Sequence, residues 1–146
     1  MRISELAKGA DVGVETIRFY ERKGLITQPL RPANGGFRTY PSETIDRVRF
    51  IREAQELGFS LGEVEELLSL KADPKTDCSA VREQARKKRD EVNAKIKRLK
   101  ALQRTLTVLI DACPGNGATT NCSILDALET GGTSKQTTKP QNSSRR

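Results

Sequence analysis

At 146 residues and a net charge of +7, the chain has room for one ordinary domain, or for a small domain with an extended element. It contains no histidine and no glycine-rich phosphate loop joining a strand to a helix, so nothing in it suggests an enzyme. No apolar run approaches the roughly 18 residues of a membrane span, and the amphipathic start is unlike a secretory signal. Three cysteines suit a reducing cytoplasm, where thiolates serve as ligands rather than as disulfides, and we expect a cytoplasmic protein.

The aromatic residues divide the chain into two parts. All six fall within the first sixty positions: Phe19, Tyr20, Phe37, Tyr40, Phe50 and Phe59. A compact core can be built there, whereas the remainder is too polar to form a globule of its own. Ten basic and six acidic residues make positions 1–52 basic, which suits a nucleic-acid partner. We therefore expect a small N-terminal domain, then an elongated helix that buries its apolar side against another chain.

Two short helices are predicted at the start of the chain. Residues 3–8 and 14–23 have apolar side chains at helical spacing, with a glycine-bearing break between them. This is the helix-turn-helix pattern, whose second helix enters a DNA major groove. Five residues of the second helix are available to the outside: Thr16, Arg18, Tyr20, Arg22 and Lys23. Because two short amphipathic helices occur in many small helical domains, this pattern alone leaves DNA binding open.

A wing and a second pair of helices are predicted to complete this domain. Two glycines and the residues after them, at 35–40, indicate a tight turn followed by a short strand. A helix is expected over 41–57, with proline near its first position. Ser60 and Glu63 have the spacing of a capping box that opens a further helix. Residues 1–70 are therefore predicted to form a winged helix-turn-helix domain.

A long helix is predicted over residues 79–112, after a connector at 71–78. Its apolar residues recur at gaps of three, four and seven and form one seam: Ala85, Val92, Ile96, Leu99, Leu102, Leu106, Leu109 and Ile110. A single exposed helix with such a seam is poorly stable, so we expect it to form a coiled coil with a second chain. Residues 113–129 are predicted as a loop with a short helix, and 130–146 as a disordered tail.

The three cysteines lie at the two ends of this helix. Cys78 precedes it, Cys113 ends it, and Cys122 follows in a glycine-containing loop. An unbroken helix from Cys78 to Cys113 would be about 50 Å long, whereas a thiolate–metal bond is only about 2.3 Å. The three thiolates can therefore converge on a metal ion only in an antiparallel homodimer, which would have two equivalent sites. The alternative is that the cysteines are small buried hydrophobic residues.

Several segments resemble the MerR family of transcriptional regulators. Residues 14–25 (VETIRFYERKGL) resemble the family's recognition helix and residues 36–40 (GFRTY) its wing. Residues 57–61 and 66–70 resemble the second helix pair. The resemblance covers residues 1 to about 129. It implies a mainly α-helical fold, with a winged helix-turn-helix domain, an antiparallel dimerisation helix and a metal-binding loop.

The resemblance also implies roles for individual residues. The predicted major-groove contacts are Thr16, Arg18, Tyr20, Arg22 and Lys23. Arg38 and Tyr40 of the wing would hold flanking phosphates. The alternative for both tyrosines is partial burial in the small core. The family's mode of action implies a homodimer on a promoter dyad, which represses without metal and activates by distorting the DNA, with RNA polymerase as a partner.

Thiolates without histidine or carboxylate partners favour soft cations. By resemblance, zinc-responsive members carry extra ligands, copper(I)- and gold-responsive members lack the cysteine before the helix, and redox members use four cysteines. The arrangement of Cys78, Cys113 and Cys122 is most similar to the mercury-responsive members, which implies mercury(II) as the effector. Lead-responsive members have a similar arrangement, so lead(II) is the alternative, with zinc and cadmium beyond it. A metal buffer that does not bind DNA, and a DNA-binding protein with inert cysteines, remain alternatives of other classes.

Overall fold

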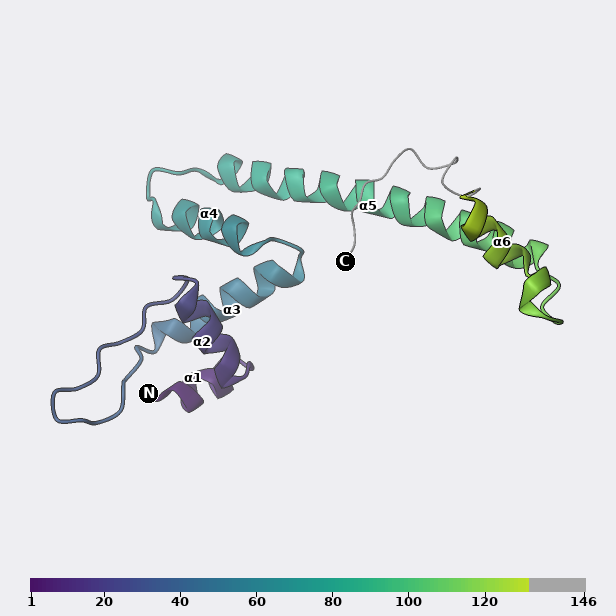
Figure 1. The fold of residues 1–146 in the computed structure, drawn as a ribbon. Helices are drawn as coiled ribbons and strands as arrows, with labels where there is room; N and C mark the ends of the chain where they lie inside the picture. Colours follow the sequence, from purple (N-terminus) through teal and green to yellow (C-terminus); the bar gives the residue numbers. More distant parts are fainter. Residues whose placement is uncertain (132–146) are drawn as a thin grey trace. The chain divides into compact units, whose positions relative to one another are not determined.

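The computed structural model describes residues 1–131, which contain six α-helices, one short 3-10 helix and no strand. The elements in chain order are α1 (Ile3–Gly9), α2 (Val14–Arg22), α3 (Glu43–Glu56), α4 (Leu61–Ala72), α5 (Cys78–Ala112), the 3-10 helix Thr119–Asn121 and α6 (Ser123–Thr130), as Figure 1 shows. The chain divides into two compact units at positions 88 and 89, within α5. No helix of residues 1–131 is long and apolar enough to cross a membrane.

The core of the first unit lies where α1, α2, α3 and α4 meet. α1 packs against α2 and α3, and α3 packs against α4. The largest fully buried side chains come from these helices and from the residues that follow α2: Leu6, Ile17, Leu25, Val48, Ile51 and Val64. The buried residues of α2, α3 and α4 recur at helical spacing (Ile17 and Tyr20; Val48, Ile51 and Ala54; Val64, Leu67 and Leu68), so each of these helices buries one apolar side. The predicted helix-turn-helix pair and the helix pair after it are confirmed, with ends that differ by one or two residues.

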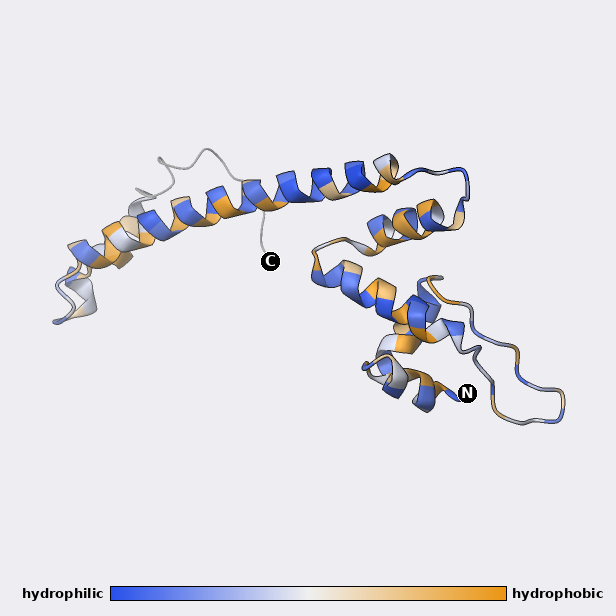
Figure 2. Cartoon of the chain, turned by 180° about the vertical axis from the view of Figure 1, so that it is seen from behind, coloured by the Kyte–Doolittle hydropathy of each residue, from blue (hydrophilic) through white to orange (hydrophobic). Residues whose placement is uncertain are grey.

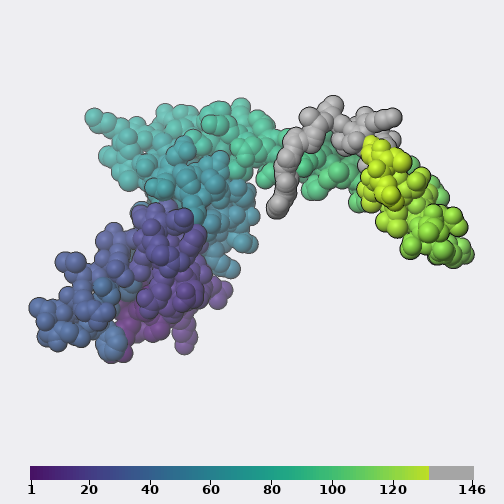
Figure 3. Space-filling view, in the orientation of Figure 1, coloured from purple at the N-terminus to yellow at the C-terminus, as the bar shows by residue number. Residues whose placement is uncertain are grey.

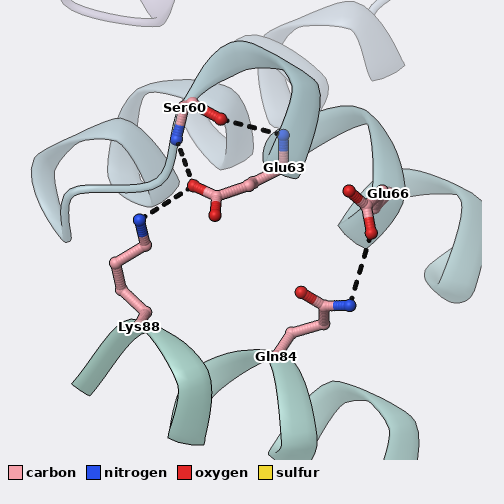
Figure 4. Close-up of polar contacts among 5 residues, drawn as sticks. All are labelled: Ser60, Glu63, Glu66, Gln84 and Lys88. Atoms are coloured by element: carbon pink, nitrogen blue, oxygen red, sulfur yellow. Dashed lines mark hydrogen bonds and ion pairs between the residues drawn. The ribbon is translucent and has the colours of Figure 1, made fainter. Parts of the chain in front are cut away.

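The start of α5 is fixed to the start of α4 by polar contacts (Figure 4). Ser60 Oγ accepts a hydrogen bond from the Glu63 backbone N–H at 3.2 Å, and the Glu63 carboxylate accepts one from the Ser60 N–H at 2.8 Å. This is the predicted capping box. The same carboxylate lies 2.8 Å from Lys88 Nζ. One helical turn earlier on α5, Gln84 Nε2 donates to Glu66 Oε2 at 3.3 Å. The residue that caps α4 therefore also anchors α5.

The loop between α2 and α3 contains the predicted turn but not the predicted strand. The Gly35 N–H donates to the Pro32 carbonyl at 3.0 Å, and Gly35 has a φ of 79°, which favours glycine. The strand expected over residues 37–40 is absent among the described residues. Pro29 and Pro32 on the facing limb have no N–H group to donate to a strand ladder. Tyr40 instead pairs with Met1 through two backbone hydrogen bonds, at 2.7 and 3.1 Å.

α5 is a single helix of 35 residues, and it begins one residue earlier than predicted. None of its residues is buried. Six exposed apolar residues of its second half follow gaps of three and four: Val92, Ile96, Leu99, Leu102, Leu106 and Ile110. Val108 is exposed outside this series. Figure 2 shows hydrophobic residues recurring along this helix. An apolar seam at this spacing is typical of a helix that pairs in a coiled coil.

After α5 the chain turns back and forms the short helix α6, as predicted. Gly131 ends α6 with a φ of 71°, a common way for helices to stop. In Figures 1 and 3 this turn and α6 are drawn at the C-terminal end of α5. Thr130, the first residue of the predicted tail, is still helical. Residues 132–146, which make up most of that tail, lie outside the described residues.

Replacing Glu63 by glutamine should weaken the pH dependence of stability in acid. A hydrogen bond from Lys88, and then one from the Ser60 backbone, lower the pKa of Glu63 to about 2 from an ordinary 4.5. Because the folded-state pKa is the lower one, the carboxylate stabilises the fold above about pH 4.5, and this contribution is lost as the pH falls toward 2. Urea denaturation of both proteins at a series of pH values measures the difference.

The matched control is Glu65→Gln, which changes an exposed carboxylate on the same helix. It should leave the acid dependence of the unfolding free energy unchanged. If the unfolding free energies of wild type and Glu63→Gln fell by the same amount between pH 4.5 and 2, the ionised Glu63 carboxylate would not stabilise the fold through Lys88.

Candidate nucleic-acid interface and metal centre

α2 presents basic side chains on the side away from the core. Ile17 is fully buried, which directs the opposite side of the helix outward. Arg18 and Arg22, one helical turn apart, are exposed, and so is Lys23 at the end of the helix. Thr16 is half-buried. Exposed guanidinium and ammonium groups at this spacing can meet phosphates or the edges of guanine bases.

The two tyrosines predicted to contact DNA are buried, with only 3% of each exposed. The Tyr20 hydroxyl donates a hydrogen bond to Gln55 Oε1 at 2.7 Å. The Tyr40 hydroxyl donates to a carboxylate oxygen of Glu21. Burial, followed by this hydrogen bond, raises the pKa of Tyr40 to about 12, so the hydroxyl keeps its proton. Both tyrosines therefore occupy the core positions that were the alternative to DNA contact.

Arg38 lies on the return limb of the loop between α2 and α3. Its Nε donates to the Pro29 carbonyl at 2.8 Å, which holds the side chain across the loop. Arg18 and Arg38 line one groove of about 270 Å³ together with Arg2 and Arg31. Arg2 and Arg31 were not singled out from the sequence, because no local pattern links residues 29 positions apart. Only the folded loop brings them together.

The structure brings Cys113 and Cys122 together. Cys113 directly follows α5, and the chain then turns through Gly115 and Gly117, which have φ values of 80° and 91°. The Cys113 side chain lies close enough to Cys122 to lower the pKa of that thiol, and both residues are half-buried. Cys78 is exposed and belongs to the other compact unit. Within residues 1–131 of one chain, no three His, Cys, Asp or Glu side chains form a group that could hold a metal ion.

The thiol of Cys122 lies beside the N-terminus of α6. The backbone N–H of Leu125 lowers its pKa most, and the N–H of Ile124 and the side chain of Cys113 lower it further, against the raising effect of burial. The positive end of the helix and these N–H groups favour the charged thiolate. A thiolate is the form of cysteine that binds metals and reacts as a nucleophile.

This pair of sulfur atoms suits a soft cation. Two thiols from one turn, in a chain that has no histidine, form a soft donor set. Beside them Ser123 Oγ is buried, and within the described part of the chain it has no hydrogen-bond partner. Two sulfur ligands are fewer than the four of a structural zinc site. A site with three sulfur ligands would therefore require one donor beyond Cys113 and Cys122.

Two family models match the chain and overlap between positions 45 and 71. The model described as MerR HTH family regulatory protein matches residues 1–71, and the one described as MerR, DNA binding matches residues 45–109. The HTH-type transcriptional regulator ZntR of Escherichia coli strain K12 is 43% identical over 132 residues, covering 89% of this chain and 93% of that protein. The mercuric resistance operon regulatory protein of Bacillus cereus is 39% identical over 127 residues, covering 87% and 96%.

A solved structure with the same architecture contains a metal ion. The transcription regulator PbrR691 from Ralstonia metallidurans CH34, in complex with lead(II), matches with a TM-score of 0.77 and 37% identity. The match covers 88% of this chain and 98% of that one. These three relatives, which have different names, are thus similarly identical to this chain, at 37 to 43%.

Alkylation of Cys122 should begin at lower pH than for an ordinary thiol. We expect an alkylation midpoint below 9.0, the ordinary thiol value, and a rise in that midpoint when Cys113→Ala removes the contribution of the Cys113 side chain. Rates of iodoacetamide labelling of the peptide that carries Cys122, followed by mass spectrometry across a pH series, measure it. A midpoint at or above 9.0 that does not respond to Cys113→Ala would contradict the described geometry.

Proposed function

Because the chain belongs to the MerR family of helix-turn-helix regulatory proteins, we propose that it is a metal-responsive transcriptional regulator whose effector is mercury(II). It acts in the cytoplasm as a homodimer on a promoter dyad. It represses transcription without metal and activates it when the metal binds. The observation that carries the proposal is the thiol pair Cys113 and Cys122 at one end of a long exposed helix that has Cys78 at its other end.

The DNA-binding part of the proposal rests on the charges of α2 and its neighbouring loop. Arg18, Arg22 and the capping residue Lys23 are exposed at the helix that the family pattern places in the major groove, and Thr16 is half-buried beside them. Arg38 holds a flanking phosphate from the loop. Two such domains in a symmetric dimer read two half-sites, because a two-fold protein matches a pseudo-palindromic operator. Tyr20 and Tyr40 contribute by packing under this surface.

The dimer part rests on the uncovered seam of α5. Its six exposed apolar residues at three- and four-residue gaps need a partner of the same length and pattern, and a second copy of α5 supplies one. In an antiparallel pair each end of the coiled coil combines the start of one helix with the end of the other. Each end then has Cys113 and Cys122 of one subunit close to the partner subunit's Cys78.

Three thiolates from two subunits form the metal site in this proposal. Cys113 and Cys122 supply a ready pair, and the partner subunit's Cys78 supplies the donor that this pair lacks. Cys78 is exposed at the first residue of α5, so it is accessible to such a partner. Three soft ligands without histidine favour a thiophilic divalent ion over zinc, which prefers four.

Mercury(II) is our first choice and lead(II) is the second candidate. The three-cysteine arrangement resembles the mercury-responsive members, and the relatives include a mercuric resistance operon regulatory protein. Lead(II) is favoured by the match to PbrR691, whose structure was solved in complex with that ion. The donor set is the same for both, so the choice depends on how each ion accommodates three sulfur ligands.

Metal binding is coupled to DNA shape through the dimer in this mechanism. A bond network that ties the start of one α5 to the end of the other changes the angle between the two DNA-binding domains. The dimer then bends and underwinds the promoter, which costs deformation energy that the metal-bound state recovers. RNA polymerase senses the altered spacing of its promoter elements. The metal site and the DNA both favour one of two arrangements of the dimer, and this shared preference couples metal binding to DNA shape.

A promoter-reporter panel tests the effector. Cells carrying the chain and its promoter are exposed to Hg(II), Pb(II), Zn(II), Cd(II) or Cu(I). We expect Hg(II) to activate at the lowest dose, and Cys78→Ser, Cys113→Ser and Cys122→Ser each to abolish the response while leaving DNA binding intact. Loss of any one ligand leaves two sulfur atoms, too few for three-coordinate binding. A tenfold lower effective dose corresponds to about 1.4 kcal/mol of binding free energy.

The matched control is Ser123→Ala, which removes an oxygen next to Cys122 but no sulfur, and should leave the response intact. Activation by Pb(II) at the lowest dose would favour the second candidate, and activation by Zn(II) at the lowest dose would overturn the assignment. Metal binding without protection of a DNA dyad would indicate a metal buffer. A metal response that survives all three cysteine substitutions would show that the cysteines are inert.

A further inference from the structure

A groove beside α2 is lined by four arginines: Arg2, Arg18, Arg31 and Arg38. No aspartate or glutamate is among the residues that line it, all of which lie between positions 2 and 40. The larger groove between α2 and α3, of about 640 Å³, mixes both signs of charge: Asp11, Glu15, Arg22, Arg52 and Glu56. Of these two grooves, only the first is lined by charges of one sign. Low-dielectric walls focus the electric field of such charges on a bound anion.

Two of these arginines are held in place by the fold. The Arg2 guanidinium lies 3.9 Å from the centre of the Phe37 ring, the distance of a close cation–π contact. The Phe37 side chain is 64% exposed, so the contact with Arg2 lies at the surface. Arg38 is held by its hydrogen bond to the Pro29 carbonyl. Arginines positioned in advance lose less conformational freedom when they bind an anion.

Nearby carboxylates are engaged elsewhere. Glu21 accepts hydrogen bonds from the hydroxyl of Tyr40 and, at 3.5 Å, from the amide of Gln28. Glu5 accepts from the backbone N–H of Arg2 at 2.8 Å, a contact of the α1 N-terminus and not of the guanidinium. None of the four arginines forms an ion pair within residues 1–131. Their positive charge is therefore available to a ligand.

We propose that Arg2 and Arg31 each contact a phosphate of the DNA backbone at this groove, in addition to the contacts of α2 and Arg38. The proposal rests on the proposed DNA binding of the chain. Arg18 belongs both to the exposed side of α2 and to the groove, so a duplex that lies on α2 passes its backbone beside Arg2 and Arg31. Phe37 is a positioning residue, since its ring holds the Arg2 guanidinium at the groove.

Salt dependence of DNA binding tests the two arginines. Full-length protein is titrated with a labelled duplex that contains its footprinted promoter dyad, and the affinity is measured by fluorescence anisotropy between about 50 and 200 mM salt. Each phosphate contact contributes about 0.9 to the slope of log affinity against log salt, so Arg2→Gln or Arg31→Gln should lower the slope by about two per dimer. Over this salt range the wild-type affinity should fall about tenfold more than that of either variant.

The control for charge is Arg82→Gln, which removes an exposed arginine of α5 outside the groove and should leave the slope unchanged. Phe37→Leu tests the positioning role, because it removes the stack and retains every charge. Phe37→Leu should lower the affinity for the duplex when Arg2 is present, and it should cause no further loss of affinity in the Arg2→Gln variant. A purely structural role for Phe37 would weaken both backgrounds equally.

The outcomes separate this inference from the proposed function. Wild-type slopes in both Arg2→Gln and Arg31→Gln, with DNA binding and unfolding midpoints intact, overturn the groove assignment alone. Equal losses on Phe37→Leu in both backgrounds overturn the positioning role. Absence of wild-type binding to any duplex overturns the proposed function, and the groove assignment with it.

Discussion

The length of α5 is the constraint on which the rest of the account depends. The helix is continuous for 35 residues, so an α-helix of that length extends about 50 Å, whereas a metal–sulfur bond is about 2.3 Å. One cysteine at the first residue of such a helix and two cysteines after its end cannot bind the same ion within one chain. The apolar seam of α5 needs a partner for a separate reason, which is its exposure. One antiparallel partner would satisfy both requirements.

Polar contacts connect α5 to α4, and α4 belongs to the N-terminal helical domain. Glu63 caps α4 and pairs with Lys88 of α5, and Gln84 bonds Glu66 one turn away. Lys88 also lies 5.5 Å from the ring centre of Phe59, directly before the cap. A change in the direction of α5 would therefore act on α4, which packs against α3, and Gln55 of α3 accepts a hydrogen bond from Tyr20 of α2. In the proposed mechanism, metal binding is transmitted there.

Local patterns in the sequence predicted most of the fold, and long-range contacts account for what they did not predict. Helical spacing and the Ser60–Glu63 cap located each helix, because both act within a few residues of one another. The expected strand at 37–40 is absent since prolines 29 and 32 cannot support a ladder. Burial of Tyr20 depends on Gln55, 35 positions away, which no local pattern shows. The pairing of Cys113 with Cys122 follows from a short glycine turn, whereas the role of Cys78 requires a second chain.

Complementation between two defective subunits tests the shared metal site most directly. Cys78→Ser retains only the pair at the end of α5, and the double variant Cys113→Ser with Cys122→Ser retains only Cys78. Neither homodimer should respond to mercury(II), but a heterodimer of the two has one intact site formed from both chains. Co-expression should restore a metal response, with one ion bound per heterodimer. A response from the Cys78→Ser homodimer alone, or no recovery in the purified heterodimer, would contradict the shared metal site.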